Sequence, residues 1–136
     1  MTNQMTIQLR QVSSSTTEAT IRTHQVLIDR PAEKGGADKG PMGGELFLAA
    51  VGGCFMSNLL AAIKAREAKI SDVRMEVVGT VTGSPACFSA VELHVTADSL
   101  DGDLLERVVE IADRACIMMN TLRGKLDLRV RTGNPV

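Results

Sequence analysis

The chain has 136 residues, a length that suits one domain with a core of its own. Its formal net charge is −1 with both signs scattered along the sequence, and its only aromatic residues are three Phe. A nucleic-acid-binding surface needs a basic patch or aromatic stacking platforms, so we expect no nucleic-acid partner. Aliphatic side chains and seven Met must fill the interior.

The cellular compartment follows from the N-terminus and the cysteines. Residues 1–6 have neither a positively charged segment nor an apolar stretch, so we expect no signal peptide. Three cysteines in a chain of this kind are typical of a reducing compartment, in which thiols do not serve as a disulfide scaffold. We therefore expect a cytoplasmic protein.

The N-terminal third predicts strands and then a loop. Residues 5–12 alternate apolar and polar side chains, which predicts a first strand. After a turn-rich break, residues 19–28 form a second segment with a preference for strand. Residues 29–44 are rich in Gly and Pro and predict a long mobile loop, a feature that often carries function.

A long central helix is predicted over residues 44–68. Within it, residues 46–63 are apolar except for Ser57 and Asn58. This stretch approaches the length of a membrane span, but a helix that is apolar on all sides is also typical of a protein core. We expect a core helix and no membrane association, because the stretch is diluted by Ala and Gly and has no second span beside it.

The C-terminal half predicts a hairpin, a helix and a last strand. Residues 73–81 and 87–97 alternate around a Gly-Ser-Pro turn. Asp101 is a suitable N-cap for a second helix, which Gly124 would end before a strand over residues 126–130.

Together these elements predict an α+β fold with antiparallel sheet, organised as one domain over residues 1–136. A helix as apolar as the central one is difficult to cover with the sheet of one small domain. We therefore expect a homodimer in which sheets from both chains wrap around long central helices.

Two cysteines carry the candidate chemistry. Cys54 and Cys116 each lie in a nearly uncharged, helix-like segment. Buried Cys is often an inert core residue, whereas a Cys beside a cation becomes a reactive thiolate that a peroxide oxidises to sulfenic acid. The Gly52-Gly53 step before Cys54 permits close approach or a bend, and Asn120 is spaced to share a helical face with Cys116.

A peroxidatic thiol also needs a cation to stabilise it and a carboxylate to hold that cation. Arg30 in the predicted loop is one candidate for the cation, and Arg10 and Arg22 on predicted strands are others. Glu45 at the start of the central helix is the candidate carboxylate, although an acidic residue is also favourable there for the helix alone.

The remaining Cys and His residues do not suggest a metal site or a cofactor. Cys87 falls on the apolar side of its predicted strand and is expected to be a small core residue. His24 and His94 have no ligand spacing such as CxxC or HxxxH, and we expect His94 on an exposed strand face.

The motifs around both cysteines resemble those of the OsmC/Ohr family. Residues 35–41 followed by residues 45–54 are similar to the signature around the first cysteine, and residues 115–122 to the motif of the second. The resemblance extends over nearly the whole chain. It implies an intertwined α+β homodimer that reduces organic (fatty-acyl or alkyl) hydroperoxides in oxidative or osmotic stress, with electrons returned by a dithiol such as a lipoylated protein.

The resemblance also implies residue roles. Cys54 would be the peroxidatic thiol and Cys116 the resolving thiol, and Arg30 matches the arginine that precedes the loop in the OsmC branch. In the Ohr branch the arginine comes from nearer the N-terminus, so Arg10 and Arg22 remain alternatives.

The family glutamate, ten residues before the first cysteine, is replaced here by Gly44. Glu45 follows one position later, and nine residues of uninterrupted helix rotate by about 900°, which would put it opposite Cys54. Glu45 therefore reaches the arginine only if the chain is not yet helical there or bends at Gly52-Gly53.

Two functions of other classes remain open. One is a non-catalytic module that binds a small apolar ligand at the dimer interface, with the cysteines as contacts. The other is a structural or stress-associated dimer without a small ligand.

Overall fold

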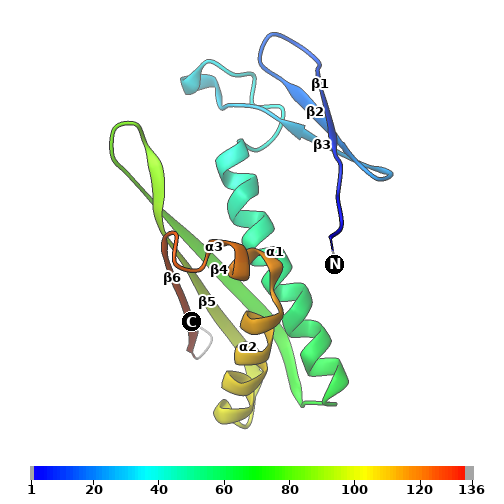
Figure 1. Ribbon diagram of the computed structural model, residues 1–136, viewed down its shortest axis with the longest axis vertical. Helices are drawn as coiled ribbons and strands as arrows, with labels where there is room; N and C mark the ends of the chain where they lie inside the picture. Colours follow the sequence, from blue (N-terminus) through cyan, green and yellow to red (C-terminus); the bar gives the residue numbers. More distant parts are fainter. Residues whose placement is uncertain (1, 134–136) are drawn as a thin grey trace. The chain divides into compact units, whose positions relative to one another are not determined.

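The structure is a computed structural model that describes residues 2–133. The chain divides into two compact units, Met1–Phe47 and Leu48–Val136, and each is described by itself. Helix α1 (Gly43–Ala65) starts in the first unit and supplies the second with its longest helical segment. Figure 1 labels the helices and strands.

The N-terminal unit is built on an antiparallel sheet of β1 (Gln8–Gln11), β2 (Thr17–Ile21) and β3 (His24–Ile28), in that order. The single strand predicted over residues 19–28 is wrong, because the chain turns back between β2 and β3. Arg22 makes this turn with a positive φ of 55°, a conformation that the residues of the segment do not signal.

The loop after β3, expected from the sequence to be long and mobile, has a defined backbone conformation. It contains a short 3₁₀ helix, η1 (Ala32–Lys34), and packs against its own backbone. A Cβ atom at Gly36 would collide with the carbonyl group of Arg30, and one at Gly40 with the carbonyl group of Leu27. The glycines are therefore required for close approach between backbone segments.

The C-terminal unit contains a mixed sheet in the order β4-β5-β6, formed by β4 (Ile70–Thr82), β5 (Cys87–Ser99) and β6 (Asp127–Gly133). The β4–β5 pair is the antiparallel hairpin predicted from the sequence. The β5–β6 pair is parallel, which corrects the expectation of a purely antiparallel sheet. A helical connection returns the chain to the same end of the sheet, and such a crossover produces parallel neighbours.

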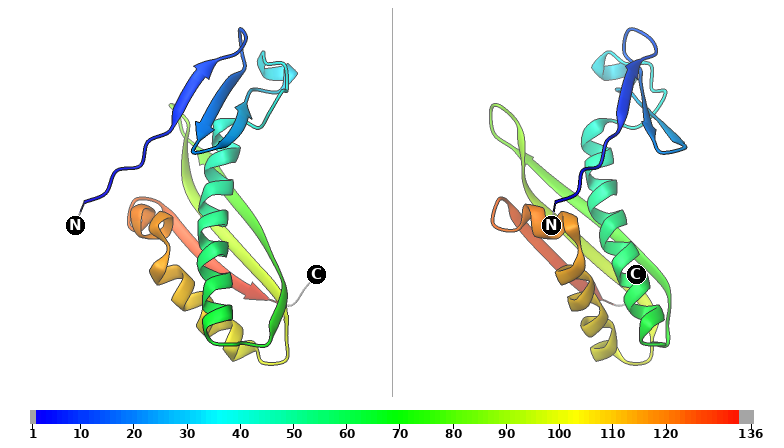
Figure 2. Two further views of the ribbon diagram at one scale, coloured as in Figure 1. Left: turned by 90° about the vertical axis from the view of Figure 1, so that its right-hand side faces the viewer. Right: turned by 45° about the vertical axis from the view of Figure 1, so that its right-hand side comes forward.

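The core of this unit lies between one face of the sheet and the helices α1 and α2 (Gly102–Ala115), as the two views in Figure 2 show. Side chains from alternate positions of β5 point into this core, while the outer face of the sheet is polar. The buried residues are Val51, Phe55, Leu59, Ala62, Ile70, Val91, Leu93, Val95, Ala97, Leu105, Val108, Val109, Ala112, Cys116 and Met119.

The predicted second helix is divided in two. Asp101 is the N-cap of α2, as expected, and its carboxylate accepts hydrogen bonds from the N–H groups of Asp103 and Leu104 at 3.0 and 3.2 Å. At Cys116 the backbone is extended, and α3 (Ile117–Leu122) follows. The apolar periodicity continues across this one-residue break, so the pattern did not reveal it.

Helix α1 is long and apolar enough to cross a membrane by length and composition. However, one side of it, including Val51, Phe55 and Leu59, is buried in the C-terminal unit. Gly52 contributes to this contact, because a Cβ atom there would lie 2.7 Å from the Val77 side chain. This side of α1 packs as a core helix does, but only 28% of its most apolar window is buried within the single chain, less than the burial on most faces that was expected.

Candidate functional site

Cys54 lies in the middle of α1, at the edge of the face that packs on the sheet. Its neighbour Phe55 is fully buried, whereas Gly53 on its other side is exposed, so Cys54 itself is half-buried. The helix fixes the backbone of Cys54, and the packing of Phe55 fixes the rotation of the helix. The thiol is thus held in place and remains partly accessible.

Cys116 lies at the junction of α2 and α3. Its φ and ψ of −77° and 116° are extended, which turns the chain from one helix into the next. The side chain is fully buried, with no exposed surface. Because the neighbouring Ala112 and Met119 are also buried, the junction directs the Cys116 thiol into the interior.

The two sulfur atoms lie 3.3 Å apart, although the residues are 62 positions apart in the chain. The Cys116 thiol donates a hydrogen bond to the Cys54 sulfur. Both thiols are free, and a disulfide bond requires an S–S separation of about 2.05 Å. A small approach of the two side chains would therefore join them.

The surroundings of Cys116 make its thiol less acidic than an ordinary cysteine. Burial raises the pKa of the Cys116 thiol above its ordinary value, and the neighbouring Cys54 raises it further, against backbone hydrogen bonds from Met119 and Met118 that lower it. Cys116 therefore retains its proton at neutral pH. Cys54 is left as the more accessible sulfur of the pair and accepts a hydrogen bond from its partner.

Asn58 is a further polar group beside Cys54. Its amide Nδ2 lies 2.9 Å from the Cys54 carbonyl oxygen and 3.9 Å from the Cys54 sulfur. Asn120, which the sequence placed on one face with Cys116, is oriented differently, since its Nδ2 donates to the Arg114 carbonyl at 3.0 Å. The Asn120 N–H donates to the Cys116 carbonyl at 3.0 Å, one helical turn away, but the Asn120 side chain is exposed whereas Cys116 is buried.

The candidate arginines lie in the N-terminal unit. Arg10 is committed to an ion pair with Glu18 at 3.1 Å, and Arg22 is in the turn between β2 and β3. Arg30 is exposed and, among residues 2–133, its guanidinium has no carboxylate within ion-pair distance. It lines an open cavity of about 760 Å³ in this unit together with Lys34.

Asp29 fixes the loop that carries Arg30, and the sequence reasoning did not identify it. One carboxylate oxygen accepts from the Arg30 N–H at 2.7 Å. The other accepts from the Thr16 hydroxyl at 2.9 Å and from the N–H groups of Ala37 and Lys39 at 3.2 Å each. An aspartate directly before a Gly-rich segment was the available signal, since Asp often binds nearby backbone N–H groups.

The hydrogen bonds of Asp29 also set its acidity. Burial alone would raise the pKa of the carboxyl, but hydrogen bonds from the backbone of Arg30 and Lys39 and from Thr16 outweigh it. The result is a pKa lowered from the ordinary 3.8 to about 2. Asp29 is thus an ionised acceptor throughout the physiological range.

Glu45 has a local role at the start of α1. Its Oε1 accepts a hydrogen bond from the Met42 N–H at 2.8 Å, as the glutamate of a capping box does. The helix already includes Gly44 and Glu45 and has no interruption at Gly52-Gly53. Among the described residues Glu45 makes no ion pair with Arg30.

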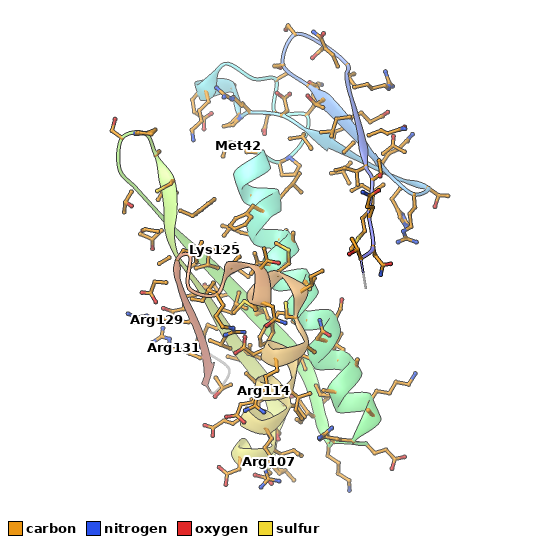
Figure 3. All side chains as sticks on the ribbon, viewed as in Figure 1. Met42, Arg107, Arg114, Lys125, Arg129 and Arg131 are labelled. Carbon is orange, nitrogen blue, oxygen red and sulfur yellow. The ribbon has the colours of Figure 1, made fainter. Side chains whose placement is uncertain are left out.

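Other sequence-based expectations concern residues away from the thiol pair. Cys87 was expected in the core but is exposed, because it starts β5 beside the turn. His94 is half-buried rather than exposed, and His24 is exposed. Figure 3 shows Arg129 and Arg131 on β6, where they pair with Asp127 and Glu92 respectively. Within residues 2–133 there is no group of three or more Cys, His, Asp or Glu with metal-binding geometry.

Solved structures of known proteins share this fold. An OsmC-like protein from Mycoplasma pneumoniae is 19% identical, with a TM-score of 0.85 and full coverage of both chains. An organic hydroperoxide resistance protein from Elizabethkingia anophelis is 20% identical, with a TM-score of 0.77 and coverage of 99% of this chain and 100% of that chain. One from Bacillus subtilis is also 20% identical, with a TM-score of 0.72 over 96% of this chain and 98% of that chain.

A comparison with curated proteins gives no match. A family model, described as OsmC-like protein, matches residues 36–131. This range contains Cys54 and Cys116 and includes α1, most of the mixed sheet and the junction at Cys116. It confirms the resemblance seen in the motifs. The chain belongs to the OsmC-like protein family.

Proposed function

We propose that this protein is a thiol-dependent peroxidase that reduces organic hydroperoxides, with Cys54 as the peroxidatic and Cys116 as the resolving cysteine. The observation that carries the proposal is the 3.3 Å contact between the two sulfur atoms. Unpaired core cysteines have no reason to meet, whereas a redox pair must. The names of the Elizabethkingia and Bacillus relatives, both organic hydroperoxide resistance proteins, point the same way.

The reaction divides into two steps. The Cys54 thiolate attacks the terminal peroxide oxygen, the O–O bond breaks, and an alcohol leaves after its alkoxide takes up a proton. Cys54 is then a sulfenic acid, oxidised by two electrons. Cys116 attacks this sulfur, a Cys54–Cys116 disulfide forms, and the sulfenic oxygen leaves as water. A dithiol reduces the disulfide and restores both thiols.

The order of the two cysteines follows from their surroundings. Cys54 is half-buried and can meet a peroxide, whereas Cys116 is fully buried and holds its proton because burial raises its pKa. The buried thiol of Cys116 is therefore proposed to be the resolving thiol, which does not react with the peroxide itself. Cys116 reacts after the Cys54 sulfur has been oxidised to the electrophilic sulfenic acid. The two sulfur atoms are 3.3 Å apart, so the reaction needs little movement.

The cation of the proposed site is Arg30. It is exposed and makes no ion pair within the described part of the chain, while Arg10 is held by Glu18 and Arg22 lies in a hairpin turn. A guanidinium beside a thiol favours the thiolate by charge. Glu45 is left out of the proposed site, because α1 is continuous from Gly43 to Ala65 and a side chain nine residues before Cys54 lies on the opposite side of such a helix. Its carboxylate accepts a hydrogen bond from the Met42 N–H instead.

The proposed substrate is an alkyl or fatty-acyl hydroperoxide. No charged residue occurs in α1 between Glu45 and Lys64, so Cys54 is presented from an apolar helix. Burial of an alkyl chain against such a surface contributes about 0.8 kcal/mol per CH₂ group. The protein is further proposed to act as a cytoplasmic homodimer, with a dithiol such as a lipoylated protein as reductant.

Turnover of cumene hydroperoxide with a dithiol tests the proposal. The wild-type protein should consume the peroxide, and Cys54→Ser should lose this activity, while Cys87→Ser, which changes an exposed cysteine, should retain it. If Cys54→Ser consumes peroxide as fast as the wild type, the proposal is wrong. A bound lipid in native mass spectrometry, without any turnover, would favour the ligand-binding module instead.

A further inference from the structure

Asn58 is an unusual residue for its position. It is one of two polar residues in the apolar segment 46–63, and unlike its neighbour Ser57 it is half-buried. An amide that loses contact with water destabilises a protein unless its hydrogen bonds are replaced. The hydrogen bonds that Asn58 makes therefore indicate why an amide occupies this position.

Within the described residues, both hydrogen bonds of the Asn58 side chain go to Cys54. Nδ2 lies 2.9 Å from the Cys54 carbonyl oxygen and 3.9 Å from Sγ. A carbonyl oxygen only accepts, so the amide nitrogen, and not the amide oxygen, must face Cys54. This nitrogen has two hydrogens, and the one that the carbonyl does not take is available to the sulfur.

We propose that Asn58 is a catalytic residue that donates a hydrogen bond to the Cys54 thiolate and stabilises it. The inference rests on the proposed function of Cys54 as the attacking thiol and extends it to a residue one helical turn away. An amide N–H at 3.9 Å is at the long end for a hydrogen bond to a neutral thiol. It shortens and strengthens when the sulfur becomes negative, because charge-assisted hydrogen bonds are the stronger ones.

The Cys54 sulfur then has two donors from different elements. The Cys116 thiol donates from the junction of α2 and α3, and Asn58 donates from α1. Both favour the charged form of Cys54. The Asn58 donor is fixed by the helix itself, since the bond to the Cys54 carbonyl orients the amide before any substrate arrives. The C-terminal unit thus has a thiolate donor of its own, independent of the loop that carries Arg30.

The test measures the pH dependence of Cys54 alkylation. In a Cys87→Ser, Cys116→Ser background only Cys54 reacts with iodoacetamide, and intact-mass spectrometry follows the rate from pH 5 to pH 10. Asn58→Leu keeps the size of the side chain and removes the donor. We expect the midpoint of the pH profile to rise by about one unit and the rate at pH 7 to fall about tenfold. Asn58→Asp should raise the midpoint at least as far, because a carboxylate repels the thiolate.

A matched control uses the other asparagine. Asn120 follows Cys116 as Asn58 follows Cys54, but its amide donates to the Arg114 carbonyl. Asn120→Leu in the same background should leave the Cys54 profile unchanged. If Asn58→Leu does not fold, Asn58→Ala removes the donor without adding a charge and decides alone. Profiles of folded Asn58 variants that coincide with that of the parent overturn the inference.

This test is separate from that of the proposed function. Alkylation needs no peroxide, so a shifted profile without peroxide turnover would refute the peroxidase and leave Asn58 as a thiolate donor. Turnover that depends on Cys54, with a profile that ignores Asn58, would refute the inference and leave the peroxidase.

Discussion

Asp29 illustrates how one side chain organises a functional segment at the scale of the residue. Its two carboxylate oxygens accept four hydrogen bonds, three of them from backbone N–H groups in the loop after β3. Arg30, the proposed cation, begins that loop. The carboxylate thereby fixes the backbone from which the guanidinium extends.

Asp29→Asn should destabilise the N-terminal unit. An asparagine has one accepting oxygen, so its NH₂ group would face N–H or O–H donors that now bind the second carboxylate oxygen. At least one buried donor would be left without an acceptor. We expect a lower urea midpoint of unfolding and faster proteolysis in the loop. Glu33→Gln is the control, because Glu33 lies in the same loop but is exposed, and this variant should behave like the wild type.

The stability contributed by Asp29 also depends on pH. Its pKa is about 2 in the folded protein against an ordinary 3.8, so the unfolded chain binds the proton more readily. The contribution is fully present above pH 3.8 and is lost as the pH falls through about 2. Urea unfolding between pH 5 and pH 2 should show a smaller loss for Asp29→Asn than for the wild type. Equal losses would contradict this account.

Some of these residues were predictable and others were not. Cys54 and Cys116 were selected from the sequence because both lie in nearly uncharged segments with family motifs, and the structure brings their sulfur atoms to 3.3 Å. Asp29 was missed because its partners are mostly backbone groups, which leave no pattern in the sequence. Asn120 lies one turn after Cys116, as its spacing predicted, but its side chain is exposed and donates to the Arg114 carbonyl.

At the scale of the element, the packing of helix α1 against the mixed sheet determines the position of the Cys54 thiol. Gly52 allows the close approach, since a Cβ there would meet the Val77 side chain at 2.7 Å and the Met75 sulfur at 3.3 Å. The β-branched Val77 side chain has few allowed rotamers and cannot easily move away from an added Cβ atom. The distance between α1 and β4 therefore depends on Gly52.

Gly52→Ala should push α1 away from the sheet and destabilise the protein by about 1–3 kcal/mol, the usual range for overpacking. The change also moves Cys54 relative to Cys116, so disulfide formation should slow. Gly102→Ala is the control, because an added Cβ at this exposed start of α2 meets nothing within 4 Å. Urea unfolding measures both variants, and equal stability of the two would contradict the close-packing argument.

The sequence predicted most elements of the C-terminal unit. Alternation identified β4 and β5, and the length of the apolar run gave α1 to within a few residues. The parallel direction of β6 was also accessible, because a helical crossover precedes it. The turn between β2 and β3 was not, since it contains no Gly, Asn or Asp that would signal a reversal.

At the scale of the whole molecule, the exposed apolar surface of each unit argues for a partner. In the described part of the N-terminal unit, Ala19 is the one buried apolar side chain, while Leu9 is 56% exposed. A three-stranded sheet needs an apolar face covered to be stable. In the C-terminal unit, Leu60 on α1 is 50% exposed. We propose that a second copy of the chain covers these exposed apolar surfaces.

The protein should therefore sediment at twice the 14.5 kDa of one chain. Leu9→Lys and Leu60→Lys should weaken the dimer, because a charge in an apolar interface loses its hydration. Val78→Lys is the control, since Val78 is similarly exposed but lies opposite Glu92 on the polar face of the sheet. Sedimentation equilibrium that gives one chain for the wild type would contradict the proposed homodimer.

The most direct measurement is the mass of the Cys87→Ser protein after one equivalent of cumene hydroperoxide without a reductant. If Cys54 and Cys116 act as a redox pair, the intact protein loses two hydrogen atoms, and digestion yields one peptide pair linked through these residues. If the protein instead stays fully reduced, or gains oxygen at Cys54 while Cys116 remains a free thiol, the pair is not a redox centre.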